Sequence, residues 1–137
     1  MRASFGRQAF MATLGARLAQ VAPGKVVIEL PFRDDLTQQH GFLHAGVLAA
    51  IADSACGYAA LSLMPAGAAV LSVEFKVNLM KPAAGSHFRA VGRVVRAGRT
   101  LTVCAGEVHA EGGEGSTVVA LMQATMMAVR ERADITD

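Results

Sequence analysis

Residues 43–63, LHAGVLAAIADSACGYAALSL, form a predicted helix of about 20 residues that is apolar on every side. Such a helix must be buried on most sides, so the rest of the fold has to surround it. Its one charged residue, Asp53, lies at the centre. Because an ionised carboxylate removed from water is costly unless something compensates it, Asp53 is either paired with a cation or kept there for chemistry.

The residues before this helix predict two strands. A clear strand is expected at 25–32, KVVIELPF, where every second residue is apolar, and a weaker one at 15–21. The dipeptide Pro23-Gly24 supplies the turn between them. A short helix over residues 5–13 is expected to precede both strands.

The cleanest alternation in the chain follows the helix and predicts a half-buried strand. Its apolar face comprises Leu71, Val73, Phe75, Val77 and Leu79, and its polar face Ser72, Glu74, Lys76 and Asn78. Three further strands are expected at 87–96, 100–110 and 117–130, separated by glycine-containing turns.

These elements predict an α+β fold with five or six strands. Short turns between the later strands are typical of antiparallel meanders. A curved sheet wrapped around the central helix is the simplest way to bury it. With 137 residues, 53% of them apolar, the chain is expected to form one domain over residues 1–137, ending in a flexible tail at about 131–137.

Composition disfavours several classes of protein. The net charge is only +2 and aromatic residues make up 5%, so a nucleic acid is an unexpected partner. A charge at the midpoint of the long helix argues against a membrane span. Cys56 and Cys104 lie in apolar segments and suit reduced core thiols, which favours a cytoplasmic location. Three arginines interrupt the first 20 residues, unlike a secretion signal.

The segment QQHGFLHAG, residues 38–46, leads into the predicted helix, and Asp53 follows His44 by nine positions. This combination resembles the hotdog acyl-CoA thioesterases of the phenylacetate-pathway type, and the similarity covers most of the chain. The resemblance implies a hotdog fold, in which a curved antiparallel sheet wraps a long central helix. It also implies hydrolysis of acyl-CoA thioesters.

In that family a His-Gly-Gly opens the helix, an Asp lies nine residues after the His, and a Ser or Thr lies near the start of the following strand. Here these places are held by His44-Ala45-Gly46, Asp53 and Ser72. The resemblance implies that Asp53 attacks the thioester carbonyl or activates water, while the Ala45 N–H binds the developing oxyanion. A helix N-terminus suits that task because it presents unpaired N–H groups and a partial positive charge.

The same resemblance assigns the remaining site residues. Ser72 is expected to orient the water, His44 to lie near the sulfur and Gly46 to contact the substrate. Two positions depart from the family pattern: Ala45 replaces a Gly and keeps the N–H, and Gln38 replaces an Asn and keeps an amide at longer reach. No cofactor and no metal are expected, since coenzyme A enters as part of the substrate.

The spacing within the helix sets a condition on this mechanism. Ala45 and Asp53 are eight residues apart, about 12 Å along a helix axis. One carbonyl cannot touch both groups of the same chain, because each contact needs roughly 3 Å. The two groups must then come from different subunits of a symmetric homodimer. The resemblance further implies that such dimers pair into homotetramers.

Basic residues are concentrated between Glu74 and Glu107, where no acidic residue occurs. Arginine forks and the N–H groups of a glycine turn suit the phosphates of coenzyme A. The residues expected to bind this end of the substrate are Lys81, Arg93, Arg96, Gly98 and Arg99.

Simpler interpretations stay open beside these. His44 is alternatively a residue that only caps the helix. Cys56 is better explained as a core residue than as a nucleophile. The basic stretch is alternatively only a solvated edge. Two other activities also fit the predicted fold: hydration or dehydration of acyl thioesters, and binding of acyl-CoA without turnover.

Overall fold

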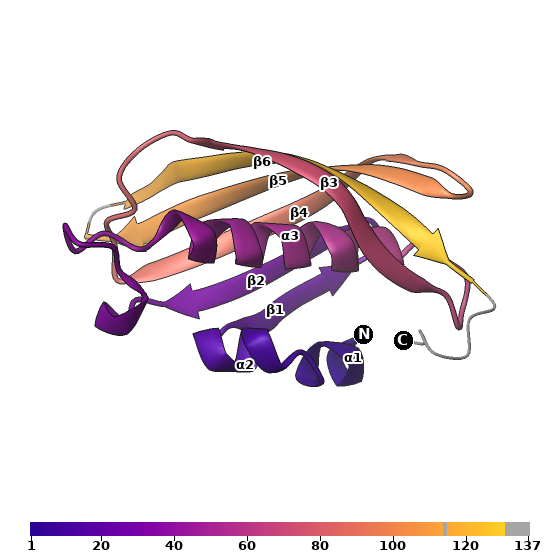
Figure 1. Cartoon of the computed structure of the whole chain (residues 1–137), viewed down its shortest axis with the longest axis horizontal. Coiled ribbons are helices and arrows are strands. Elements are labelled where there is room, and N and C mark those ends of the chain that lie inside the picture. Colours follow the sequence, from indigo (N-terminus) through magenta and orange to yellow (C-terminus); the bar gives the residue numbers. More distant parts are fainter. Residues whose placement is uncertain (114, 131–137) are drawn as a thin grey trace.

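The computed structural model describes residues 1–113 and 115–130. Helices and strands follow one another in the order that the sequence predicts (Figure 1). The elements are α1 (Arg2–Gly6), α2 (Ala9–Leu14), β1 (Arg17–Ala22), β2 (Lys25–Pro31), the short 3-10 helix η1 (Asp34–Leu36), α3 (Ala45–Leu61), β3 (Ala69–Leu79), β4 (His87–Ala97), β5 (Leu101–Gly112) and β6 (Gly115–Val129).

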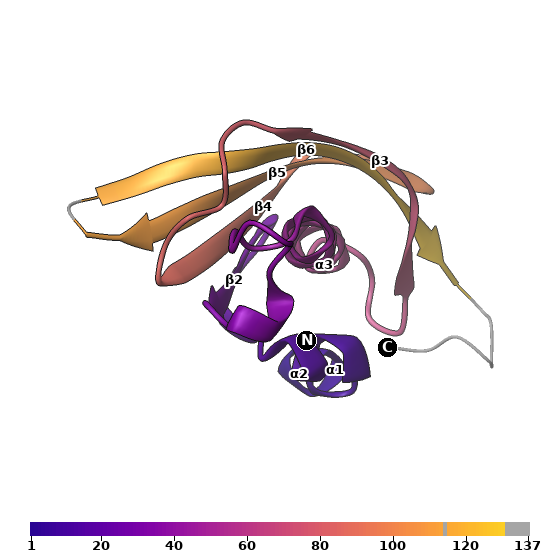
Figure 2. The same ribbon diagram turned by 60° about the vertical axis from the view of Figure 1, so that its left-hand side comes forward.

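The six strands form one antiparallel sheet in the order β1-β2-β4-β5-β6-β3. Figure 2 looks nearly along α3 and shows the sheet curving around this helix, with α1 and α2 beyond its open side. This is the hotdog arrangement, so the predicted fold class is confirmed. The N-terminal helix expected over residues 5–13 is instead two short helices, since α1 ends at Gly6.

The core forms where α3 packs on the concave face of the sheet. Ile51, Ala55 and Cys56 of α3 are completely buried there. The closest approach is at Gly92 of β4, where a Cβ atom would overlap the backbone of Ala55 and Cys56. Glycine is therefore required for the helix to lie this close to the sheet.

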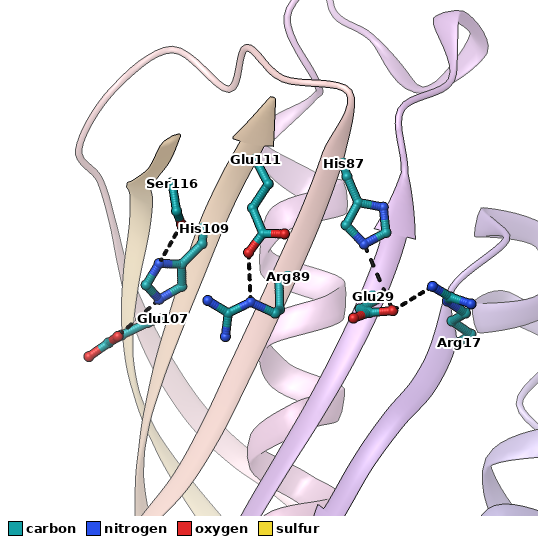
Figure 3. A network of polar contacts seen from close by, with 8 residues as sticks. All are labelled: Arg17, Glu29, His87, Arg89, Glu107, His109, Glu111 and Ser116. Carbon is teal, nitrogen blue, oxygen red and sulfur yellow. Dashed lines mark hydrogen bonds and ion pairs between the residues drawn. The ribbon is translucent and has the colours of Figure 1, made fainter. Parts of the chain in front are cut away.

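The opposite face of the sheet carries charged side chains that pair with one another (Figure 3). The Glu29 carboxylate of β2 forms an ion pair with the Arg17 guanidinium of β1 at 2.7 Å, and the Glu111 carboxylate of β5 forms one with the Arg89 guanidinium of β4 at 2.7 Å. The hydrogen bond from Arg89 lowers the pKa of the Glu111 carboxyl below its ordinary value. His109 lies 3.1 Å from Glu107 on the same face.

Strand β3 corrects one prediction. It lies at the edge of the sheet, and its apolar side chains are exposed in the single chain: Leu71 to 43%, Val73 to 55%, Phe75 to 47% and Leu79 to 54%. The expected half-buried strand is therefore wrong for one copy of the chain. An edge strand has a neighbour on one side only, and no element of the described chain covers it.

The predicted alternation along β3 is also wrong at one point. The register shifts between Ser72 and Glu74, which marks a bulge at Val73. Ser72 pairs with the buried Met126, and Phe75 pairs with the buried Ala124. Ser72 therefore faces α3 together with Phe75 rather than the solvent-facing side with Glu74, because a bulge reverses the alternation.

Three other expectations concern composition and chain ends. Cys56 and Cys104 are free, buried thiols, as predicted. The tail expected at residues 131–137 lies outside the described residues. Among the helices of residues 1–113 and 115–130, none combines the length and apolarity that crossing a membrane requires.

The contact at Gly92 gives a first prediction. Replacement of Gly92 by Ala is expected to lower the free energy of unfolding by about 1–3 kcal/mol or more, because the added methyl forces helix and sheet apart. Gly6→Ala is the matched control, since no heavy atom lies within 4 Å of the corresponding Cβ. Chemical denaturation measures both variants, and equal stability of Gly92→Ala and the unchanged protein would contradict the packing described here.

Candidate active site

The start of α3 holds an available hydrogen-bond donor. His44 is the N-cap, with extended backbone (φ −64°, ψ 140°), and its Nδ1 accepts the Gly46 N–H at 2.9 Å. The His44 carbonyl accepts the N–H groups of Val47 and Leu48. The Ala45 N–H has no acceptor among the described residues. A peptide donor at the positive end of a helix is thus left unpaired.

A cavity of about 460 Å³ opens beside this donor. Its wall comprises Gln38, Phe42, Leu43, Ala45, Leu48, Leu79, Met80, Lys81, Pro82 and Ala83. The structure therefore brings Gln38 and Lys81 to Ala45, from segments on either side of α3 in the sequence. The Gln38 side-chain oxygen accepts a hydrogen bond from the His40 N–H, so this oxygen is used within the loop that contains both residues.

Asp53, the ninth residue of α3, is half-buried. Its Oδ1 accepts the Ser72 hydroxyl at 2.7 Å. No ion pair links Asp53 to any described residue, although Arg7 lines the same cavity. Among the described residues of one chain, Asp53 is therefore not half of an ion pair.

The cavities around Asp53 and Ala45 are separate in one chain. Asp53 lines one cavity with Ser72 and another with Gly46, and Ala45 lines neither. Eight residues of regular helix separate the two groups, about 12 Å. The sequence-based argument that one chain cannot apply both groups to the same carbonyl holds in the folded chain.

The residues expected to bind phosphates lie in different places. Lys81 is at the Ala45 cavity. Arg93 lies on the solvent face of β4, 3.4 Å from Glu107. Arg96, Gly98 and Arg99 lie at the β4–β5 turn, at the end of the molecule where α3 finishes (Figure 1). Within one chain, the structure does not bring the last four residues to the Ala45 cavity.

The cysteines are poorly suited to nucleophilic chemistry. Burial raises the pKa of the Cys56 thiol above its ordinary value, with further contributions from Cys104 and Asp53. Burial also raises the pKa of Cys104 to about 11. Both groups therefore stay protonated near neutral pH, and a protonated thiol is a weak nucleophile. Among the described residues, no three His, Cys, Asp or Glu side chains gather as a metal site requires.

Sequence reasoning missed the side chains that α1, α2 and their linker place near Asp53. Ser4, Arg7 and Gln8 line one of its cavities. The Ser4 hydroxyl lies 3.0 Å from the Tyr58 hydroxyl, and Gln8 accepts the Ser54 hydroxyl at 3.5 Å. The residues of these pairs are 54 and 46 positions apart in the chain, and no local sequence pattern predicts such contacts.

Comparison with known proteins agrees with the geometry. The family model described as the thioesterase superfamily matches residues 40–117, the segment that contains Ala45, Asp53 and Ser72. The chain belongs to the thioesterase superfamily.

The chain is also similar to individual proteins of known structure or activity. The crystal structure of a thioesterase family protein from Silicibacter pomeroyi superimposes with a TM-score of 0.93 at 52% identity, covering 95% of this chain and 96% of that one. Human acyl-coenzyme A thioesterase 13 is 33% identical over 61% of this chain and 60% of its own length. This chain spans less than two thirds of the length of the curated relatives it matches.

One structural neighbour bears on the finer resemblance. The E. coli PaaI protein, from the phenylacetic acid degradation operon, superimposes with a TM-score of 0.82 at 23% identity, covering 93% of this chain and 88% of that one. At this identity the similarity supports the shared fold.

The cap on α3 gives a second prediction. His44→Ala removes the acceptor for the Gly46 N–H and is expected to lower the free energy of unfolding by about 1 kcal/mol. His44→Asn supplies another capping oxygen and is expected to restore most of that loss. Denaturation of the three proteins measures the effect. Full stability in His44→Ala would show that the cap contributes nothing, and low turnover in a stable His44→Asn would reveal a chemical role for the imidazole.

Proposed function

We propose that the protein hydrolyses acyl-CoA thioesters at a site shared between two copies of the chain. Asp53 of one copy acts as general base or nucleophile, and the Ala45 N–H of the other copy receives the oxyanion. The observation that carries this proposal is a pair of groups on α3: a carboxylate that no cation of residues 1–113 and 115–130 pairs with, and a helix-terminal N–H that has no acceptor among the same residues. Similarity to human acyl-coenzyme A thioesterase 13 supports the substrate class.

The exposed edge of the sheet supports a dimer. Strand β3 is unpaired along one side and exposes a row of large apolar side chains. Exposed apolar edge strands are avoided in monomers because they pair with other chains. In the proposed two-fold dimer this strand is buried, and the proposal requires each Asp53 to face the start of α3 in the partner. Pairing of such dimers into tetramers stays an expectation.

The bulge in β3 defines a role for Ser72. Its hydroxyl donates to Asp53 Oδ1, which fixes the carboxylate and leaves Oδ2 free to accept a proton or attack carbon. In this proposal Ser72 orients the carboxylate directly, and the water only through it.

In the water-activated form of the reaction, Asp53 takes a proton from water while the water oxygen bonds to the thioester carbon. The carbonyl oxygen becomes an oxyanion that the Ala45 N–H stabilises. Collapse of this intermediate breaks the C–S bond, and coenzyme A leaves as a thiol after taking up the proton. In direct attack, Asp53 bonds to the thioester carbon, the C–S bond breaks and coenzyme A leaves as a thiolate, which gives a mixed anhydride with the Asp53 carboxyl. Water then hydrolyses this anhydride to the free acid and the Asp53 carboxylate, and the proton released protonates the thiolate. The positions of Asp53 and Ala45 serve both forms.

A third prediction follows for Asp53. Asp53→Asn is nearly isosteric and is expected to lower kcat by about 10²–10⁴-fold with little change in stability, because the amide is neither base nor nucleophile. Asp34→Asn, at an exposed position in η1, is the control. Release of free thiol from a panel of acyl-CoAs measures the rates, and near-normal hydrolysis by Asp53→Asn would remove Asp53 from the mechanism.

The same panel separates the alternative activities. Addition of water to an enoyl-CoA without thiol release would indicate a hydratase. Binding of acyl-CoA by calorimetry, with no product from any of them, would indicate a non-catalytic binding module.

A fourth prediction concerns the oxyanion donor. Ala45 is the first residue of α3, where proline is well tolerated, and the extended backbone of His44 suits a residue before proline. Ala45→Pro thus removes the N–H while keeping the helix, and is expected to lower kcat by about 10²–10³-fold.

Two controls separate the donor from added bulk at this position. Ala45→Gly keeps the N–H and removes the methyl, and Ala45→Val keeps the N–H and adds bulk. Both are expected to retain much more activity than Ala45→Pro. Equal loss in the valine and proline variants would show that crowding, rather than the donor, explains the effect.

A further inference from the structure

Asp53 lies in the walls of two cavities of opposite character. One, of about 250 Å³, is mostly polar: its wall comprises Ser4, Arg7, Gln8, Asp53, Ser54, Gly57, Tyr58, Val70 and Ser72. The other, of about 540 Å³, is mostly apolar: its wall comprises Gln8, Ala9, Phe10, Met11, Gly46, Ala49, Ala50, Asp53, Ser54 and Phe75. Gln8, Asp53 and Ser54 belong to both walls and form the boundary.

Building on the proposed function, we infer that the apolar cavity holds the acyl group, and that α2 selects which acyl groups are hydrolysed. The substrates are thioesters of uncharged aliphatic or aryl acids whose chain extends beyond the first few carbons. The volume of the cavity is within the range of small-molecule pockets.

The wall contributed by α3 leaves room for such a chain. Gly46, Ala49, Ala50 and Asp53 are spaced i, i+3, i+4 and i+7, so they share one face of the helix. The first three have at most one side-chain carbon. Asp53 is the only charged residue of this wall. A carbonyl held at the carboxylate thus has its apolar chain beside small residues.

Two aromatic rings form the facing walls. Phe10 of α2 is 59% exposed and Phe75 of β3 is 47% exposed in the single chain. Both line the cavity beside Asp53. Covering these rings with an apolar acyl group removes hydrocarbon from water on both molecules, which favours binding.

The polar cavity is a poor place for the same chain. The exposed Arg7 lines it together with Ser4, Tyr58 and Asp53, and an apolar group there would take the Arg7 guanidinium out of water without offering it a hydrogen bond. This smaller cavity suits water on its way to Asp53. The difference in polarity therefore assigns the acyl chain to the side of Phe10.

The position of α2 is fixed by contacts of the preceding residues. Phe5 packs edge-on against Tyr58 with ring centroids 5.7 Å apart, and the Ser4 hydroxyl lies 3.0 Å from that of Tyr58. Gln8 accepts the Ser54 hydroxyl just before α2 begins. Residues 9–14 precede the segment 40–117 that the family model matches.

The test compares kcat/KM for acetyl-, butanoyl-, octanoyl- and phenylacetyl-CoA. Ala50→Leu puts three more carbons into the cavity, and is expected to lower the octanoyl and phenylacetyl values about ten-fold or more while the acetyl value changes less than about three-fold. Ala12→Leu makes the same change at an exposed site on α2 outside both cavities and is the control. Retained acetyl-CoA turnover shows that each variant is folded.

A second variant covers the case in which Ala50→Leu does not fold. Phe10→Ala changes an exposed side chain outside the core, and is expected to reduce selectivity for the longer chains. Unchanged acyl preference in this variant and in Ala50→Leu, or a preference that shifts with Arg7→Gln instead, would overturn the inference. If the unchanged protein hydrolyses no thioester, the proposed function fails by itself. Calorimetry of octanoyl-CoA binding to the same variants then decides whether the apolar cavity holds the acyl group.

Discussion

The proposed site depends on the distance that the helical rise of α3 sets between the Ala45 N–H and Asp53. Because α3 is regular from Ala45 to Leu61, its first N–H and the Asp53 carboxylate stay about 12 Å apart. The helix has little freedom to bend toward the sheet, since Gly92 brings the two backbones into direct contact. In each chain the proposed base and the proposed oxyanion donor are therefore too far apart to act on one carbonyl, and the proposed thioester site takes one group from each of two chains. The unpaired β3 edge offers the surface through which two chains can meet.

Local irregularities then position the Asp53 carboxylate. The bulge at Val73 turns Ser72 toward α3, where its hydroxyl holds Asp53 without neutralising it. A guanidinium in the same place would stabilise the anion more strongly and make it a poorer base. The α1–α2 segment closes the other side of Asp53 and divides the space there into a polar and an apolar part. The few residues around the middle of α3 thus take part both in the packing of the fold and in the proposed chemistry.

Much of this could be predicted from the sequence, because hydrophobic periodicity is a local property. The central helix, the strand ranges and the position of Asp53 follow from it directly. The face of Ser72 could not be predicted, since a one-residue bulge reverses the alternation without changing the pattern of apolar residues. The pairing of Arg93 with Glu107 depends on strand register. The cavity walls formed by residues 7–11 depend on contacts between residues some 46 positions apart in the chain. The alternation along β3 also does not reveal that its apolar side chains are exposed in a single copy of the chain.

The central claim is that every site combines Asp53 of one chain with the Ala45 N–H of another, and mixing of two inactive variants tests it most directly. Asp53→Asn and Ala45→Pro, each nearly inactive alone, are combined in equal amounts under conditions that allow subunit exchange. Half of the resulting dimers are mixed, and each of these has one intact site of two, so the account predicts recovery of about one quarter of the unchanged activity. No recovery, with mixed dimers demonstrated by mass spectrometry, would contradict it.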